Sequence, residues 1–221
     1  MDKNIEFYLY HGKGVIPNNT ISDILNELDT VDNWKHFPKD ERNLKGTFDK
    51  DAKKMDGLAG SSLTVDWNDI YNKEMNIDSS VELNYSLCRL PQSPALDEFN
   101  TAVSTTLDYY IKDYLKDINW YDCYNGKTDP QFINYKTEHD MITHCDHVRH
   151  IFDGERKGIP TLSIVGMLTD NYDGGEIVFW EDKSFKLGKG DLLIFPSNFL
   201  YPHEIKEVVS GNRISFVSWV W

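Results

Sequence analysis

Residues 188–221 read GKGDLLIFPSNFLYPHEIKEVVSGNRISFVSWVW. In this stretch, short runs of Leu, Ile, Val, Phe and Trp alternate with clusters of Gly, Pro, Asn and Ser, which is typical of short β-strands joined by turns. Earlier runs have the same character: PQFINYK at 130–136, TLSIVGMLT at 161–169 and GGEIVFWE at 174–181. The glycine pair at 174–175 predicts a tight hairpin. Strands spaced this closely predict a β-sandwich or a barrel-like roll.

The N-terminal part predicts supporting elements around this β core. IEFYLY at 5–10 predicts a first strand, and NNTISDILNELDTV at 18–31 predicts a helix whose first amides are capped by Asn or Thr. The stretch 93–118 predicts a long helix, because its apolar residues recur at spacings of three, four and seven behind a Ser-Pro start. We therefore expect an α+β protein with a mainly β core, organised as a single domain over 1–221.

Residues 45–76 differ in character from the segments on either side. They are rich in Lys, Asp, Gly and Ser, with scattered Met and Trp, and they are longer than the usual connection in a compact domain. A flap over a binding site and an ordered but irregular surface excursion both fit this composition. We treat 45–76 as a candidate flap.

The composition disfavours several classes of partner and location. The formal net charge is −13, so the average surface repels phosphate backbones and nucleic acid is disfavoured as a partner. No apolar run approaches the about 20 residues that a membrane-spanning helix needs. Three cysteines without a CxxC pair argue against a disulfide framework. These features predict a cytoplasmic protein. The Asn-, Lys- and Ile-rich composition suggests an AT-rich genome, and a viral source would place the protein in the host cytosol.

The densest group of chemically active side chains is HDMITHCDHVRH at 139–150, which holds four of the seven histidines. On a β-strand, alternate residues face the same side, so His144 and Asp146 would point together while Cys145 points into the core. A histidine and a carboxylate two residues apart form half of a 2-His-1-carboxylate site. Such a site suits Fe(II) and leaves coordination positions open.

A second group of candidate residues lies in YPHEIKEVVSGNRISFVSW at 201–219. His203 is predicted on a strand, a turn is predicted at 210–212, and Arg213 would return on the next strand of a hairpin. His203 would supply a third metal ligand. The guanidinium of Arg213 is suited to clamp a carboxylate through two charge-assisted hydrogen bonds, and Ser215 would face the same side.

These residues resemble the Fe(II)- and 2-oxoglutarate-dependent oxygenases, most closely the prolyl 4-hydroxylase-like branch, from about 132 to 221. As in that family, Tyr135 stands nine residues before His144, and Arg213 stands ten residues after His203. The segments YDGGEIVFW and GKGDLLIFPS also resemble family segments, and they follow in the family's order. The resemblance therefore extends over five ordered features.

The resemblance implies a fold and a set of ligands. The fold would be a double-stranded β-helix (a jelly roll, cupin-like) with supporting N-terminal helices, in which 131–221 form the catalytic core and 1–130 the support. Its Fe(II) ligands would be His144, Asp146 and His203. The residues that would bind 2-oxoglutarate are Arg213 with Ser215 or Tyr135. O2 would be the second cosubstrate, and ascorbate is a candidate reductant.

The resemblance also implies an activity, the hydroxylation of a C–H bond with conversion of 2-oxoglutarate to succinate and CO2. The substrate would be a prolyl residue in a peptide or protein. Its candidate contacts are the flap, Trp67, Tyr71 and Tyr85. Glu138 and Met141 stand where the family often has Gly and Tyr, so the wall of the pocket is altered.

Other functions stay open on the residues themselves. Within the same enzyme class, the substrate would be a free amino acid or another small metabolite. Outside it, a non-catalytic β-roll metal-binding protein and a zinc hydrolase both fit two histidines and an aspartate. Arg213 disfavours the last two, because neither needs a buried anion clamp. The sequence predicts no oligomeric state.

Overall fold

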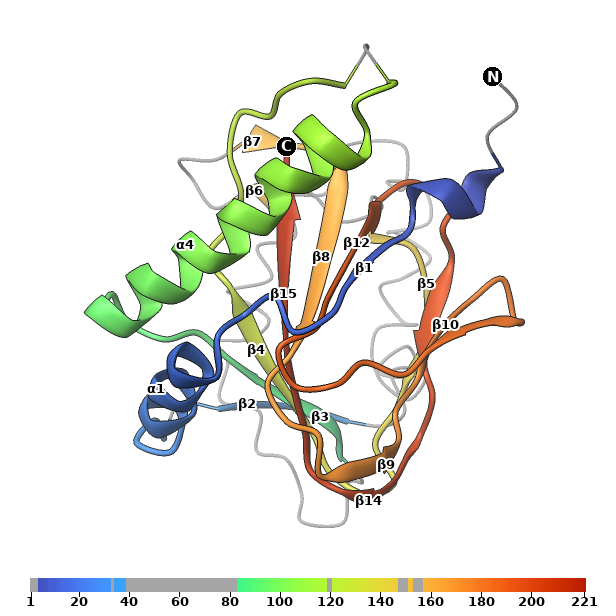
Figure 1. Cartoon of the computed structure of the whole chain (residues 1–221). Coiled ribbons are helices and arrows are strands. Elements are labelled where there is room, and N and C mark those ends of the chain that lie inside the picture. Colours follow the sequence, from blue (N-terminus) through green and yellow to red (C-terminus); the bar gives the residue numbers. More distant parts are fainter. Residues whose placement is uncertain (1–3, 33, 39–82, 119–120, 147–150, 153–156) are drawn as a thin grey trace, which may run out of the picture.

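The computed structural model describes residues 4–32, 34–38, 83–118, 121–146, 151–152 and 157–221 (Figure 1). Within these ranges the chain is mainly β with few helices, as the sequence predicted, and the strands pair in antiparallel sheets. The candidate flap 45–76, with Trp67 and Tyr71, lies outside the described residues. None of the helices in the described ranges is long and apolar enough to cross a membrane.

The larger sheet contains β1 (Tyr10–Gly12), β2 (Lys35–Pro38), β3 (Leu83–Cys88), β4 (Gln131–Tyr135), β8 (Leu162–Met167), β12 (Leu192–Pro196) and β15 (Arg213–Val220). These seven strands follow the order β1-β12-β8-β15-β4-β3-β2. On the central strand β15, Phe216 pairs with Gly166 of β8 and with Phe132 of β4. A Cβ atom at position 166 would lie 2.1 Å from the Phe216 ring, so this close approach requires glycine.

The smaller sheet contains β5 (Met141–His144), β10 (Ile177–Phe179), β11 (Lys183–Phe185) and β13 (His203–Ile205). Their order is β11-β10-β13-β5. Two further antiparallel pairs join β9 (Tyr172–Gly174) to β14 (Val208–Gly211) and β6 (Ile151–Phe152) to β7 (Lys157–Gly158). The β-rich C-terminal part is therefore built from short strands that are distributed among these sheets.

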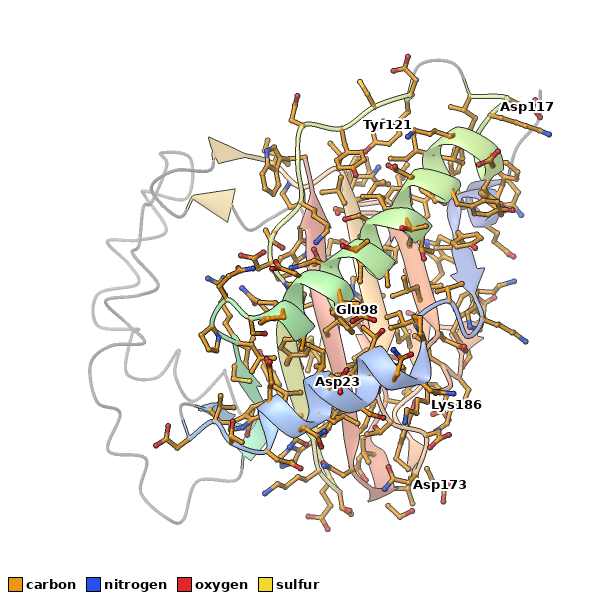
Figure 2. All side chains as sticks on the ribbon, turned by 60° about the vertical axis from the view of Figure 1, so that its left-hand side comes forward. Asp23, Glu98, Asp117, Tyr121, Asp173 and Lys186 are labelled. Atoms are coloured by element: carbon orange, nitrogen blue, oxygen red, sulfur yellow. The ribbon has the colours of Figure 1, made fainter. Side chains whose placement is uncertain are left out.

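Two helices, α1 (Asn18–Leu28) and α4 (Pro94–Tyr109), lie across one face of the larger sheet in both views (Figures 1 and 2). Phe99 of α4 stands edge-on to Phe216 of β15, with 4.8 Å between the ring centroids. Ser93 caps α4 by accepting a hydrogen bond from the Leu96 amide at 3.0 Å, as the Ser-Pro start predicted. This face of the sheet holds one of two apolar cores.

The second apolar core joins the larger sheet to the smaller one. Leu193 and Phe195 of β12 belong to the same buried cluster as Phe179 of β10 and Ile205 of β13. The two sheets therefore face each other across an apolar layer. The side chains that the sequence singled out come from both of them.

The first N-terminal element differs from the prediction. Ile5–Tyr8 form a 3-10 helix (η1) rather than a strand, and β1 begins only after it. The carbonyls of Phe7 and Tyr8 accept hydrogen bonds from the hydroxyls of Tyr114 and Tyr110, each at 2.9 Å. These tertiary contacts hold the segment against the helical layer, which overrides its strand-like composition.

The helix ends also differ from the prediction. α1 begins after Pro17, whose ring cannot cap an amide, so no Asn or Thr side chain caps this helix. The long helix predicted over 93–118 is α-helical only to Tyr109, and a π-helical turn (η2, Tyr110–Tyr114) continues it. Tyr110 is fully buried in that turn, so packing of this side chain accompanies the change in winding.

Candidate functional site

Two histidines face each other at the ends of two paired strands. His144 ends β5 and His203 begins β13, and the two residues are direct partners in the antiparallel register. Their imidazole centroids lie 4.4 Å apart. His203 is buried, with the Phe195 and Phe179 rings at 4.9 Å and 5.3 Å. The strand register therefore brings together two residues that are distant in the sequence.

Backbone carbonyls fix the orientation of both imidazoles. His144 Nδ1 lies 2.8 Å from the Ile142 carbonyl oxygen, and His203 Nδ1 lies 3.1 Å from the Tyr201 carbonyl oxygen. Because a carbonyl only accepts, each Nδ1 carries the proton and donates it. Each Nε2 then keeps its lone pair free, which is the arrangement that metal-binding histidines use.

Asp146 completes the group. Its Oδ1 lies 3.4 Å from His144 Nε2 and 4.0 Å from His203 Nε2. One ligand atom from each of the three residues lies within 4.8 Å of the others. Two imidazole nitrogens and one carboxylate oxygen at this spacing are able to hold one divalent transition-metal ion, and the donor set fits Fe(II).

His144 and Asp146 lie together, but not because they alternate along one strand, as the sequence predicted. β5 ends at His144, so Asp146 lies beyond the strand and strand alternation does not orient it. Cys145 was expected in the core, but it is only half-buried, and its Sγ lies 3.8 Å from the Phe199 carbonyl oxygen. His144 and Asp146 therefore lie close together, although the strand on which they were predicted is shorter.

The charges of this group favour a cation. Burial raises the pKa of Asp146, but its interactions with His144, His203 and Ser163 outweigh this effect and hold the pKa well below the usual range. Burial also lowers the pKa of His203, although Asp146 opposes this shift. At neutral pH the group therefore presents an ionised carboxylate beside a neutral imidazole of His203, which suits a bound metal cation.

Arg213 is the largest fully buried side chain among the described residues. Its Nε donates to the Gly175 carbonyl at 3.0 Å, and its Nη1 donates to the Ser215 hydroxyl at 2.9 Å. Its Nη2 is buried and has no hydrogen-bond partner in the described part of the chain. Burial lowers the pKa of Arg213, while Tyr135 and Tyr172 oppose that shift. A buried guanidinium with an unpartnered donor is suited to bind an anionic ligand.

His203 and Arg213 do not lie on one hairpin, contrary to the prediction. β13 pairs with β10 and β5, β14 pairs with β9, and β15 runs in the larger sheet. His203 and Arg213 therefore come from the two facing sheets. The ten residues between them cross from one sheet to the other.

The glycine pair at 174–175 supports Arg213 instead of forming a tight hairpin. β9 ends at Gly174 and pairs with β14, whereas β10, which follows the pair, bonds to β13. Gly175 has a φ of +64°, and a Cβ atom there would lie 2.7 Å from Arg213 Cδ. Glycine is required here because the backbone is left-handed and the Arg213 side chain packs directly on it.

Tyr135 lies under the guanidinium. The Arg213 Cζ atom lies 4.9 Å from the centroid of the Tyr135 ring, and the Tyr135 hydroxyl points to the Met141 sulfur at 3.8 Å. Tyr85 packs against the same ring, with 5.7 Å between centroids. Burial raises the pKa of Tyr135, Arg213 lowers it, and the charge of Asp146 raises it further. Tyr135 thus packs between the Arg213 guanidinium, the Met141 sulfur and the Tyr85 ring.

Two residues that contact Asp146 were missed in the sequence. The Ser163 hydroxyl and the Trp219 indole nitrogen both donate to Asp146 Oδ2. Ser163 gives no signal, because its role depends on a contact between distant strands. Trp219 could have been found from the sequence, because alternate residues of a strand face the same side and Trp219 alternates with Arg213 and Ser215 on β15.

The C-terminal part of the chain matches a known family. Residues 130–221 match the family described as the 2OG-Fe(II) oxygenase superfamily. A PKHD-type hydroxylase of Prochlorococcus marinus strain MIT 9312 is 41% identical over 68 residues, which is 28% of this chain and 30% of that protein. A PKHD-type hydroxylase of Idiomarina loihiensis is 33% identical over 81 residues, 35% of each chain. The matched part thus spans about a third of these relatives, and it confirms the resemblance to the Fe(II)- and 2-oxoglutarate-dependent oxygenases.

Solved structures share the fold at low sequence identity. A viral collagen prolyl hydroxylase from Paramecium Bursaria Chlorella virus-1 aligns with a TM-score of 0.55 and 14% identity, over 96% of this chain and 94% of that one. A Trichoplax adhaerens prolyl hydroxylase, solved with a peptide fragment of the hypoxia inducible factor oxygen degradation domain, aligns with a TM-score of 0.58 and 13% identity, over 97% and 83%. The likeness extends over nearly the whole chain, including the N-terminal elements.

We expect Asp146→Ala to weaken the binding of Mn(II), a redox-stable substitute for Fe(II), by more than about 100-fold. Loss of an outer partner of a metal ligand costs about 10–100-fold, and loss of the only carboxylate ligand should cost more. Electron paramagnetic resonance of free Mn(II) measures the affinity. Asp113→Ala, which removes an exposed carboxylate from η2, serves as the control. Equal affinities of the two variants would contradict the assignment of Asp146.

We expect Gly175→Ala to lower the free energy of unfolding by about 1–3 kcal/mol, because it combines a left-handed backbone with a steric overlap. Urea denaturation measures the change. Gly188→Ala is the matched control, since its Cβ would have no neighbour closer than 3.7 Å. Equal stability of the two variants would show that Arg213 does not pack on Gly175 as described.

Proposed function

We propose, from the membership of residues 130–221 in the 2OG-Fe(II) oxygenase superfamily, that this protein is an Fe(II)- and 2-oxoglutarate-dependent hydroxylase whose substrate is a prolyl residue in a peptide or protein. The family implies Fe(II), 2-oxoglutarate and O2 as cofactor and cosubstrates. In this proposal the two facing sheets form a double-stranded β-helix, with 131–221 as the catalytic core and 1–130 as its support.

The observation that carries the proposal is the unpartnered Nη2 of the buried Arg213. A buried cation is costly unless an anion accompanies it, and no carboxylate of the described residues forms an ion pair with this guanidinium. 2-Oxoglutarate has a carboxylate at each end, so one end is able to bind the metal and the other Arg213. The Tyr135 ring lies beside this guanidinium, 4.9 Å from the Arg213 Cζ atom.

Each residue then has a separate task. His144, Asp146 and His203 would hold the metal, with the two Nδ1–H groups anchored on backbone carbonyls. Arg213 would bind the distal carboxylate of 2-oxoglutarate, and Ser215 would orient the guanidinium through its hydroxyl. When bound, Fe(II) and 2-oxoglutarate supply the oxidising chemistry, in which O2 and 2-oxoglutarate yield succinate, CO2 and one hydroxylated C–H bond.

The apolar layer between the sheets protects this chemistry from water. The rings of Phe179 and Phe195 lie against His203 and belong to the buried cluster that also contains Tyr135. A dry environment strengthens the interaction of Arg213 with an anion and limits side reactions. Of the candidate substrate contacts, Tyr85 is buried against Tyr135, so it would shape the pocket from within rather than meet a peptide at the surface.

The prolyl substrate is supported by the named relatives. The sequence relatives are PKHD-type hydroxylases, and the solved structures with the same fold include prolyl hydroxylases, one of them in complex with a peptide. A free amino acid remains the alternative substrate within the class. A zinc hydrolase or a non-catalytic metal-binding protein would have no use for Arg213 with an unpartnered donor. Ascorbate as reductant and a cytoplasmic location remain predictions.

We expect Arg213→Ala to abolish 2-oxoglutarate-dependent succinate formation while leaving Mn(II) affinity largely unchanged. Removing one partner of a buried charged pair costs about 2–5 kcal/mol, which corresponds to roughly 30-fold or more in 2-oxoglutarate affinity. Arg89→Ala, at an exposed position, is the matched control. Wild-type succinate formation by Arg213→Ala would contradict the proposal that Arg213 binds 2-oxoglutarate.

We expect peptides that contain proline to stimulate succinate formation above the rate without substrate. Mass spectrometry should find a gain of one oxygen atom on proline, and the same peptides with Ala in place of Pro should give no stimulation. Free proline is tested in parallel. Stimulation by free proline alone would move the substrate to the amino-acid alternative.

A further inference from the structure

The two carboxylate oxygens of Asp146 lie in different surroundings. Oδ1 faces the two imidazoles, at 3.4 Å and 4.0 Å from their Nε2 atoms. Oδ2 accepts hydrogen bonds from the Ser163 hydroxyl at 2.5 Å and from the Trp219 indole nitrogen at 3.1 Å. Ser163 on β8 and Trp219 on β15 are direct partners in the larger sheet. The carboxylate thus has one oxygen toward the histidines and the other toward the sheet.

A third residue fixes the direction of these hydrogen bonds. Ser163 Oγ lies 2.7 Å from Ser197 Oγ, and both serines are buried. Because an ionised carboxylate only accepts, the single hydroxyl proton of Ser163 goes to Asp146 Oδ2. Ser197 must then donate its own proton to Ser163. The order Ser197 to Ser163 to Asp146 is therefore the one arrangement that satisfies both contacts.

We propose that Ser163, Ser197 and Trp219 form a carboxylate clamp, which reserves Asp146 Oδ2 for the protein and leaves Oδ1 alone to bind the metal. The inference rests on the metal site of the proposed function. A carboxylate is able to bind a metal through one oxygen or through both. Binding through both would here require the loss of two hydrogen bonds, one of them short and charge-assisted. The clamp residues are positioning residues, which act through Asp146.

The clamp is needed because Asp146 lies beyond the end of β5. His144 and His203 are held by the strand register and by their backbone carbonyls, whereas Asp146 has no strand partner. The clamp replaces that support with side chains from β8, β15 and the residue after β12. Binding through one oxygen also leaves one more coordination position for 2-oxoglutarate, O2 or water.

The test compares Mn(II) binding and bound water across matched variants of the full chain. Ser163→Ala and Trp219→Phe each remove one donor to Oδ2, and Ser197→Ala removes the donor to Ser163. Ser218→Ala is the serine control, because its buried hydroxyl donates to the Thr128 carbonyl at 2.7 Å. Trp180→Phe is the indole control, because its nitrogen donates to the Leu200 carbonyl at 2.7 Å. The two control variants therefore separate loss of the clamp from loss of a hydrogen bond elsewhere in the protein.

We expect Ser163→Ala and Trp219→Phe each to weaken Mn(II) binding by about tenfold, with a smaller effect for Ser197→Ala. The water-proton relaxivity of the Mn(II)-loaded protein should also fall in the first two variants, because the released Oδ2 displaces a bound water. A merely structural role would leave the relaxivity of the loaded protein unchanged. The two controls should match the wild type in both measurements.

Two results would overturn the clamp. Wild-type affinity and relaxivity in Ser163→Ala and Trp219→Phe would show that these hydrogen bonds do not keep Asp146 Oδ2 from the metal. An equal loss in the clamp variants and the controls, without a change in relaxivity, would show a general effect of packing. If the wild-type protein itself binds no Mn(II), the proposed function fails, and the clamp fails with it.

Discussion

The burial of Arg213 is the constraint on which the rest of the site depends. A guanidinium inside an apolar layer is stable only if its donors are occupied, and the chain occupies two of them with Gly175 and Ser215. The third group, Nη2, has no hydrogen-bond partner among the described residues, and in the proposed function it binds the ligand. The left-handed glycine at 175 and the Tyr135 ring beneath the guanidinium both follow from the need to accommodate this side chain. Gly175 and Tyr135 are therefore arranged around this buried cation.

A second feature is that the two histidines of the proposed metal site and Arg213 come from opposite sheets. β5 and β13 bring His144 and His203 together in the smaller sheet, while β15 carries Arg213 in the larger one. A ligand with two acidic ends would then bridge the sheets. Asp146 is joined to both sides, since one oxygen faces the histidines and the other bonds to Ser163 and Trp219 of the larger sheet.

The sequence predicts the residue types of the site better than their placement. His144, His203 and Arg213 were proposed because their spacing follows a known pattern, and the structure brings the two histidines into one group with Asp146. The hairpin between His203 and Arg213 was wrong, because strand alternation and turn residues do not reveal which sheet a strand joins. Local patterns likewise mistook η1 for a strand, since its hydrogen bonds go to tyrosines of a distant helix. Ser163 and Ser197 had no sequence signal, because their roles arise only from pairing between strands.

The most direct test of the account is an anaerobic visible spectrum of the protein with Fe(II), recorded before and after addition of 2-oxoglutarate. If 2-oxoglutarate binds the metal group and Arg213 together, a metal-to-ligand charge-transfer band should appear when it is added and disappear on addition of a chelator of Fe(II). A protein that binds Fe(II) but shows no band at saturating 2-oxoglutarate would contradict the account.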